Sequence, residues 1–228
     1  MNPSRALIAL LTLASTGARA DYVIVQKVEG GMQSGQMTLK IKDTNMRVDI
    51  APQVSVITVG ATGDNITLMH TQKQFMRVPA EQTKALMEQM QKSQAGGKPA
   101  STEPAKASAT GRKERVENRD CEIYEWARSG TAVTYWITKD FPNHAKINAA
   151  LAAAQSSGLG ALARTVLPSA TELPGMAVKT QMTVGTQKVI TTIVSAKEET
   201  VDPALFTIPA DYKELPGPAF NAPTPAAP

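Results

Sequence analysis

The sequence predicts an α+β fold: a strongly curved antiparallel β-sheet of about ten strands, a half-barrel, with two or three helices covering its concave face. Apolar and polar residues alternate with period two along most of the chain, which is typical of strands with one buried face. Tight turns separate these stretches, as in an antiparallel meander. Two stretches with helical spacing interrupt the strands, and such insertions favour helices packed on one side of the sheet.

The strand signals recur along most of the chain. In one of them, Val133, Tyr135 and Ile137 share one face of the strand and Trp136 lies on the other. The expected strands lie at 22–25, 36–42, 46–50, 54–59, 65–69, 74–78, 113–118, 120–128, 131–138, 176–184 and 188–196.

Helical spacing replaces this alternation in three places. Residues 80–93 carry an apolar stripe that includes Met87 and Met90, which predicts an amphipathic helix. A second helix is expected at 142–154, and a short third one at 159–166.

The first twenty residues have the features of a secretory signal peptide. Arg5 supplies a positive start, residues 6–14 are apolar, and Ala18-Arg19-Ala20 gives the small-x-small pattern of a cleavage site. The apolar run is too short to span a membrane as a helix, and the alternative is an amphipathic or buried N-terminal helix. We expect cleavage between Ala20 and Asp21, and a periplasmic or secreted protein without a transmembrane segment.

The remaining chain is expected to form one domain at 21–215. Residues 94–112 contain no side chain more apolar than alanine, so we expect a disordered insertion there. The proline-rich tail at 216–228 is expected to be disordered too. The formal net charge of +4 comes from the first twenty residues and from the insertion. The neutral remainder argues against a dedicated nucleic-acid-binding protein.

Catalytic and metal-ligating patterns are sparse. The only two histidines, His70 and His144, have no His or Cys partner at ligand spacing, so no metal site or cofactor is expected. Asp120, Glu122 and Glu125 are interpreted as a solvated acidic edge, with a glycosidase-type carboxylate pair as the alternative.

The single cysteine, Cys121, alternates with apolar residues in a strand-like stretch. It is interpreted as a buried small side chain, and the alternative is an intermolecular disulfide.

Methionine is frequent on the expected apolar faces, and its flexible side chain suits cavities for varied apolar ligands as well as irregular cores. Both interpretations, cavity and core, remain open. The residues that could line a ligand cavity are Met37, Leu39, Ile41, Met46, Val48, Met176, Val178 and Met182.

Several short motifs resemble a known family. The segment VDPALFTIPADY, which ends at Tyr212, is similar to the D-x-x-L-F-x-I-P-x-x-Y close of the bacterial domain-of-unknown-function family 4412. Similar blocks precede it, although Asn118 stands where that family usually has glycine. These blocks are MRVD at 46–49, QFMRVP at 74–79, NRDCEIYE at 118–125 and PGMAVK at 174–179.

This resemblance implies a secreted protein related in strand order and helix placement to the half-barrel lipoprotein carriers LolA and LolB. It implies no activity, because a fold does not determine a function. The leading hypothesis is therefore a periplasmic, non-enzymatic protein that binds an apolar ligand or a lipidated protein in the concave face. The alternative is an envelope sensor or interaction module with a filled core.

The cleavage site gives a direct prediction. Protein recovered from the periplasm should have an intact mass that begins at Asp21, because Ala18 and Ala20 fit the two shallow pockets of signal peptidase. Retention of Met1 in that fraction would contradict the cleaved signal peptide, and with it the argument from the sequence for the compartment.

Overall fold

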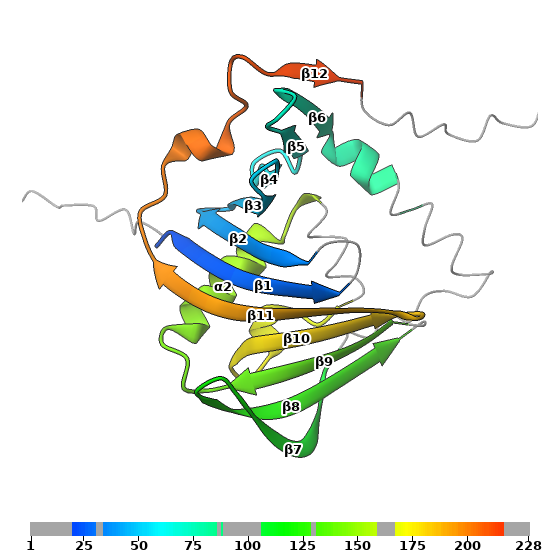
Figure 1. Ribbon diagram of the computed structural model, residues 1–228, viewed down its shortest axis with the longest axis vertical. Helices are drawn as coiled ribbons and strands as arrows, with labels where there is room; N and C mark the ends of the chain where they lie inside the picture. Colours follow the sequence, from blue (N-terminus) through cyan, green and yellow to red (C-terminus); the bar gives the residue numbers. More distant parts are fainter. Residues whose placement is uncertain are drawn as a thin grey trace, which may run out of the picture.

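The computed structural model describes residues 20–30, 34–85, 88, 106–128, 131–158 and 167–216. Twelve strands form one sheet in the order β12-β6-β5-β4-β3-β2-β1-β11-β10-β9-β8-β7 (Figure 1). The strands are β1 (Tyr22–Gly30), β2 (Gly35–Lys42), β3 (Asn45–Ala51), β4 (Val54–Thr58), β5 (Asn65–Met69), β6 (Gln74–Val78), β7 (Ser108–Val116), β8 (Arg119–Arg128), β9 (Thr131–Thr138), β10 (Met176–Val184), β11 (Gln187–Glu198) and β12 (Lys213–Leu215). The prediction of a largely antiparallel sheet is confirmed, but the number of strands exceeds ten. β12 pairs with β6 in parallel and escaped prediction because three residues carry no measurable period.

Two meanders make up this sheet, and the pairing of β1 with β11 joins them. β1 to β6 follow one another along the chain, and so do β7 to β11. Tight turns at Asp43 and Gly185 connect neighbouring strands, and both residues have positive φ angles of 55° and 58°. Glycine adopts this conformation freely and aspartate tolerates it better than most residues, so both turns have suitable residues.

The helix α2 (His144–Ala154) lies on the concave face of the sheet. It contacts both β2 and β10, which are separated by β1 and β11, so the sheet must curve around it. Ile147 is buried there against Ile24 and Ile41 in the largest apolar cluster. The Asn148 side chain donates to the Gly175 carbonyl at 3.0 Å and so anchors the helix to the start of β10.

A C-terminal strap, residues 201–212, covers the opposite, convex face of β4 to β6 before the chain enters β12. It includes the short 3₁₀ helix η2 (Pro203–Phe206), whose first turn Asp202 caps by accepting from the Ala204 amide at 2.9 Å. The strap side chains Phe206 and Ile208 pack on a buried cluster of Ile57, Ile66, Leu68 and Phe75.

The prediction of a disordered insertion at 94–112 is wrong for its last residues. β7 begins at Ser108, so the last five residues of that stretch belong to a strand, where pairing with β8 supplies the order that their composition does not. Residues 80–85 are helical, as expected for the start of the first helix. The signal segment 1–19, the rest of the insertion before residue 106, the third expected helix at 159–166 and the tail at 217–228 lie outside the described residues.

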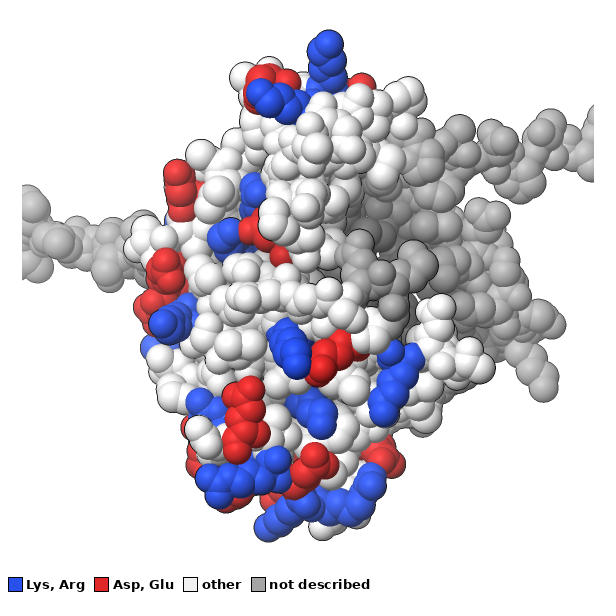
Figure 2. All heavy atoms as spheres, in the orientation of Figure 1, with Lys and Arg blue, Asp and Glu red and all other residues white. Residues whose placement is uncertain are grey.

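Charges of both signs are interspersed over the convex side of β7 to β11 (Figure 2). Arg112 of β7 and Glu125 of β8, for example, form an exposed ion pair. Among the described residues, no helix is long and apolar enough to cross a membrane.

Candidate functional site

Two uncharged hollows lie on the concave face, beside the part that α2 fills. The first hollow, of about 280 Å³, lies over β9 to β11, and its lining residues are Val133, Tyr135, Gln155, Leu167, Pro168, Ala170, Leu173, Ala177, Thr180, Met182, Val189 and Thr191. The second hollow, of about 450 Å³, lies over β1 to β3, and its lining residues are Val28, Ser34, Gly35, Gln36, Met37, Ile50 and Ala51. Among the residues that the structure describes, neither lining contains a charged side chain.

The register of the sheet places the two hollows side by side. Val28 of the second hollow is paired directly with Thr191 of the first across β1 and β11. Val28 also shares its face with Ile24, which packs under α2, because residues two apart on a strand point the same way. The concave face therefore continues from the filled core beneath the helix into an uncharged trough.

The wall of the first hollow is held by local hydrogen bonds. Residues 167–175 lead from the α2 side to β10 and contain the 3₁₀ helix η1 (Ala170–Glu172). Ser169 and Glu172 form a capping box there, in which the Ser169 amide donates to the Glu172 carboxylate at 3.1 Å. This capping box supplies hydrogen-bond partners to the backbone N–H groups at the start of the short helix and keeps Leu173 against the sheet.

The residues predicted from sequence to line a cavity divide into two groups. Met37 lines the second hollow and Met182 the first. The other six belong to the packed core or lie against it: Leu39, Ile41, Met46, Val48, Met176 and Val178. Sequence reasoning missed Tyr135 and the threonines of the first hollow, because only the strand register brings them together.

Tyr135 is the most buried polar side chain in the lining, with 7% of its surface exposed. Burial raises the pKa of its hydroxyl to about 12. No neighbouring charge contributes to this shift, which agrees with the uncharged composition of the hollow.

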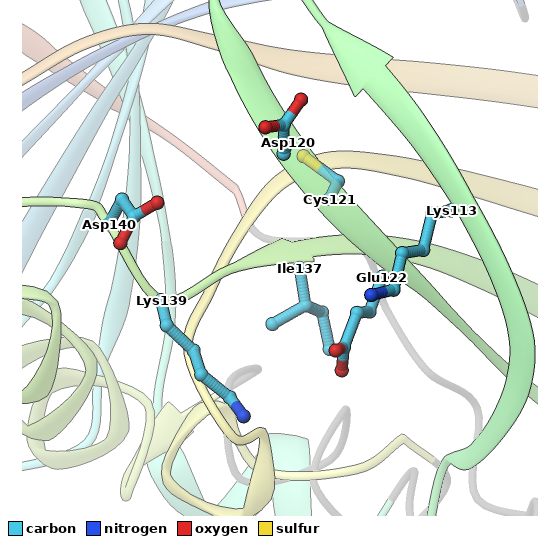
Figure 3. A pocket seen from close by; sticks show the side chains of 7 residues that line it. All are labelled: Lys113, Asp120, Cys121, Glu122, Ile137, Lys139 and Asp140. Carbon is cyan, nitrogen blue, oxygen red and sulfur yellow. The ribbon is translucent and has the colours of Figure 1, made fainter.

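A third hollow, of about 240 Å³, is charged and lies over β7 to β9 (Figure 3). The side chains of Lys139 and Glu122 extend toward the open space beside Ile137. Cys121 lies at its edge, is 2% exposed, and burial raises the pKa of its thiol. A buried thiol with a raised pKa is a weak nucleophile, so its role here is packing.

The three carboxylates singled out in the sequence do not all meet at this hollow, because Asp120 and Glu122 line it and Glu125 does not. Glu125 binds Arg112 in an exposed ion pair and lies three residues from Glu122, on the other face of β8. Glu122 accepts from the Tyr124 hydroxyl at 3.5 Å. The described residues contain no group of three His, Cys, Asp or Glu side chains that could hold a metal ion.

A polar network on the convex face superficially resembles a serine-histidine-aspartate triad. The Ser55 hydroxyl donates to Asp49 at 2.6 Å, and the same oxygen lies 2.7 Å from Nε2 of His70. His70 Nδ1 in turn lies 2.6 Å from the Tyr212 hydroxyl. Because the serine proton goes to Asp49, His70 donates to Ser55 instead of removing its proton. Ser55 is also 1% exposed, so this arrangement does not suit nucleophilic catalysis.

The network instead attaches the C-terminal strap to the sheet. Arg47 donates to the Leu205 carbonyl at 2.8 Å and to Ser55 at 2.8 Å. Asp49 accepts from Arg47 at 2.7 Å and is paired with Lys40. Burial alone would raise the pKa of Asp49, but the hydrogen bonds from Lys40, Ser55 and Arg47 outweigh it and lower the pKa to about 2.

A family model described as Domain of unknown function (DUF4412) matches residues 24–212. The chain belongs to this family. The structure explains the closing motif of the resemblance, since Asp202 caps η2, Phe206 and Ile208 pack on the convex cluster, and Tyr212 contacts His70.

Several solved structures resemble this fold distantly. Among curated proteins, none matches the sequence. PNGF-II has 8% sequence identity to this chain and a TM-score of 0.42. The match covers 88% of this chain and 31% of PNGF-II, so this chain spans about a third of the length of PNGF-II. LprF from Mycobacterium bovis has 12% identity and a TM-score of 0.33, over 86% and 90% of the two chains. A DUF1329 family protein from Desulfovibrio piger has 10% identity and a TM-score of 0.27, over 84% and 91%. Such likeness does not extend to function.

The lowered pKa of Asp49 predicts an acid-sensitive strap. A carboxyl whose pKa is depressed in the folded state contributes stability above its unfolded pKa of about 4 and loses it as the pH falls toward about 2. Urea unfolding should show a decrease of about 2 kcal/mol over this window, and Asp49→Asn should remove most of that decrease.

Asp211→Asn is the matched control. Asp211 pairs with Lys73 at 2.9 Å on the surface, where an ion pair contributes little, so this variant should keep the wild-type pH dependence. Equal pH dependence in wild type and Asp49→Asn would contradict the role given to Asp49.

Proposed function

We propose that this protein is a non-enzymatic binding protein of the periplasm, which holds an apolar ligand against the concave face of its sheet. Acyl chains, lipids and lipoprotein tails are ligands of this kind. The observation that carries the proposal is the pair of adjoining hollows, whose lining is uncharged and whose floor is formed by Val28, Met37, Val133 and Met182.

The size and composition of the hollows suit this role. Pockets for small ligands usually measure about 300–1,000 Å³, and the second hollow lies within this range while the first is close to its lower limit. Burial of hydrocarbon contributes about 0.8 kcal/mol per CH₂ group, so an acyl chain needs no charged partner to bind. Met37 and Met182 can adjust their side chains to chains of different shape.

The signal segment and the burial of the potentially reactive side chains also support the proposal. The signal segment that ends at Ala20 would deliver the mature chain to the periplasm. The Ser55–His70 pair lies under the strap and is positioned for structure, and Cys121 is buried, so we assign neither a catalytic role.

A matched pair of enlarged side chains tests the trough. Met182→Trp places bulk in the first hollow, so it should abolish saturable binding of the neutral fluorescent probe N-phenylnaphthylamine without lowering the melting temperature. Val178→Phe enlarges a core side chain that is 3% exposed, so it should cost about 1–3 kcal/mol in stability and leave probe affinity unchanged below its melting temperature.

Thermal unfolding and probe titration are to be measured on the same preparations of both variants. Failure of the wild-type mature protein to bind the probe would reject the binding function and favour the interaction module. Equal loss of binding in both variants would place the probe elsewhere than in the trough.

A further inference from the structure

The first hollow contains a row of hydroxyl groups that crosses three strands. Tyr135 of β9 pairs with Thr180 of β10, and Thr180 pairs with Thr191 of β11. All three line the hollow. None of their hydroxyl groups hydrogen-bonds a side chain or backbone group among the described residues. Tyr135 is 7% exposed, so its ring forms part of the floor of the hollow and its hydroxyl stands in line with those of Thr180 and Thr191.

A parallel row of apolar side chains runs directly beside the hydroxyl row. Val133 of β9 pairs with Met182 of β10, and Met182 pairs with Val189 of β11. Each member lies two residues along its strand from a hydroxyl residue, so both rows point into the same hollow. The surface therefore presents neutral hydrogen-bonding groups along one line and hydrocarbon along the next.

We propose that this double row selects the acyl ester of a lipid: the ester carbonyl accepts a hydrogen bond from the Tyr135 hydroxyl, and the acyl chain lies along Val133, Met182 and Val189. This inference rests on the proposed binding function and adds the chemistry of the ligand. A free fatty acid fits less well. Its carboxylate would lose hydration in a hollow whose described lining residues include no cationic side chain to compensate it.

The test measures displacement of N-phenylnaphthylamine from the mature protein by dodecanoate and by its methyl ester at neutral pH. The ester should bind at least about tenfold more tightly than the acid, because only the acid brings an uncompensated charge into the hollow. Tyr135→Phe should weaken the ester about fivefold relative to the probe measured on the same variant, the effect of losing one hydrogen bond.

Tyr124→Phe is the matched control. Tyr124 lies on β8 outside the lining, and its hydroxyl donates to Glu122. It should keep the wild-type preference for the ester. The melting temperature of Tyr135→Phe is to be measured as well, so that a loss of ester affinity is compared between folded proteins.

The outcomes separate this inference from the proposed function. If the probe binds but the acid binds as tightly as the ester, or if Tyr135→Phe has no effect on the ester, the selection of acyl esters is refuted while apolar binding stands. If the wild-type protein binds neither probe nor ester, the binding function itself fails.

Discussion

The rest of the structure depends on the pairing of β1 with β11. This ladder places Tyr22 opposite Glu198 and Gly30 opposite Val189, and so connects segments at nearly opposite ends of the described chain. Each meander by itself would leave its apolar concave side exposed to water. Joined by β1 and β11, they curve around α2 and bury a common core. The same ladder aligns Val28 with Thr191, which makes one trough from two hollows.

The difference in size between a helix and a sheet explains why this core is filled at one place and open at another. α2 runs across the strands, since it contacts both β2 and β10, and a helix with its side chains is only about 10–12 Å wide. The twelve residues of β11 extend for about 40 Å. Within the described part of the chain, α2 therefore covers only part of the strand length, and the uncharged trough is the apolar surface that α2 leaves uncovered. On the convex side, by contrast, the strap covers the apolar cluster around Leu68. The network of Arg47, Asp49 and Ser55 attaches the strap to the sheet.

The candidate site shows where prediction from sequence ends. Alternation correctly placed Met37 and Met182 on apolar faces, and it separated Tyr135 from Trp136. The same alternation also predicted Leu39 and Val178 as cavity-lining residues, but both belong to the packed core. A period of two shows which face of the strand a side chain occupies, and it does not show what packs on that face. The position of α2 decides which part of the face is filled, and that position follows from contacts with strands distant in sequence.

What the sequence by itself determined is local: the strands, the turns at Asp43 and Gly185, the start of α2 and the motif that ends at Tyr212. These features depend on a few neighbouring residues, so spacing and turn chemistry suffice to predict them. Only the tertiary structure decided the register of β9, β10 and β11, which assembles the hydroxyl row, and the docking of the strap, which brings His70 within 2.6 Å of Tyr212. Both depend on pairing between segments far apart in the chain, and a shift of one residue in register would turn every side chain of a strand to the opposite face.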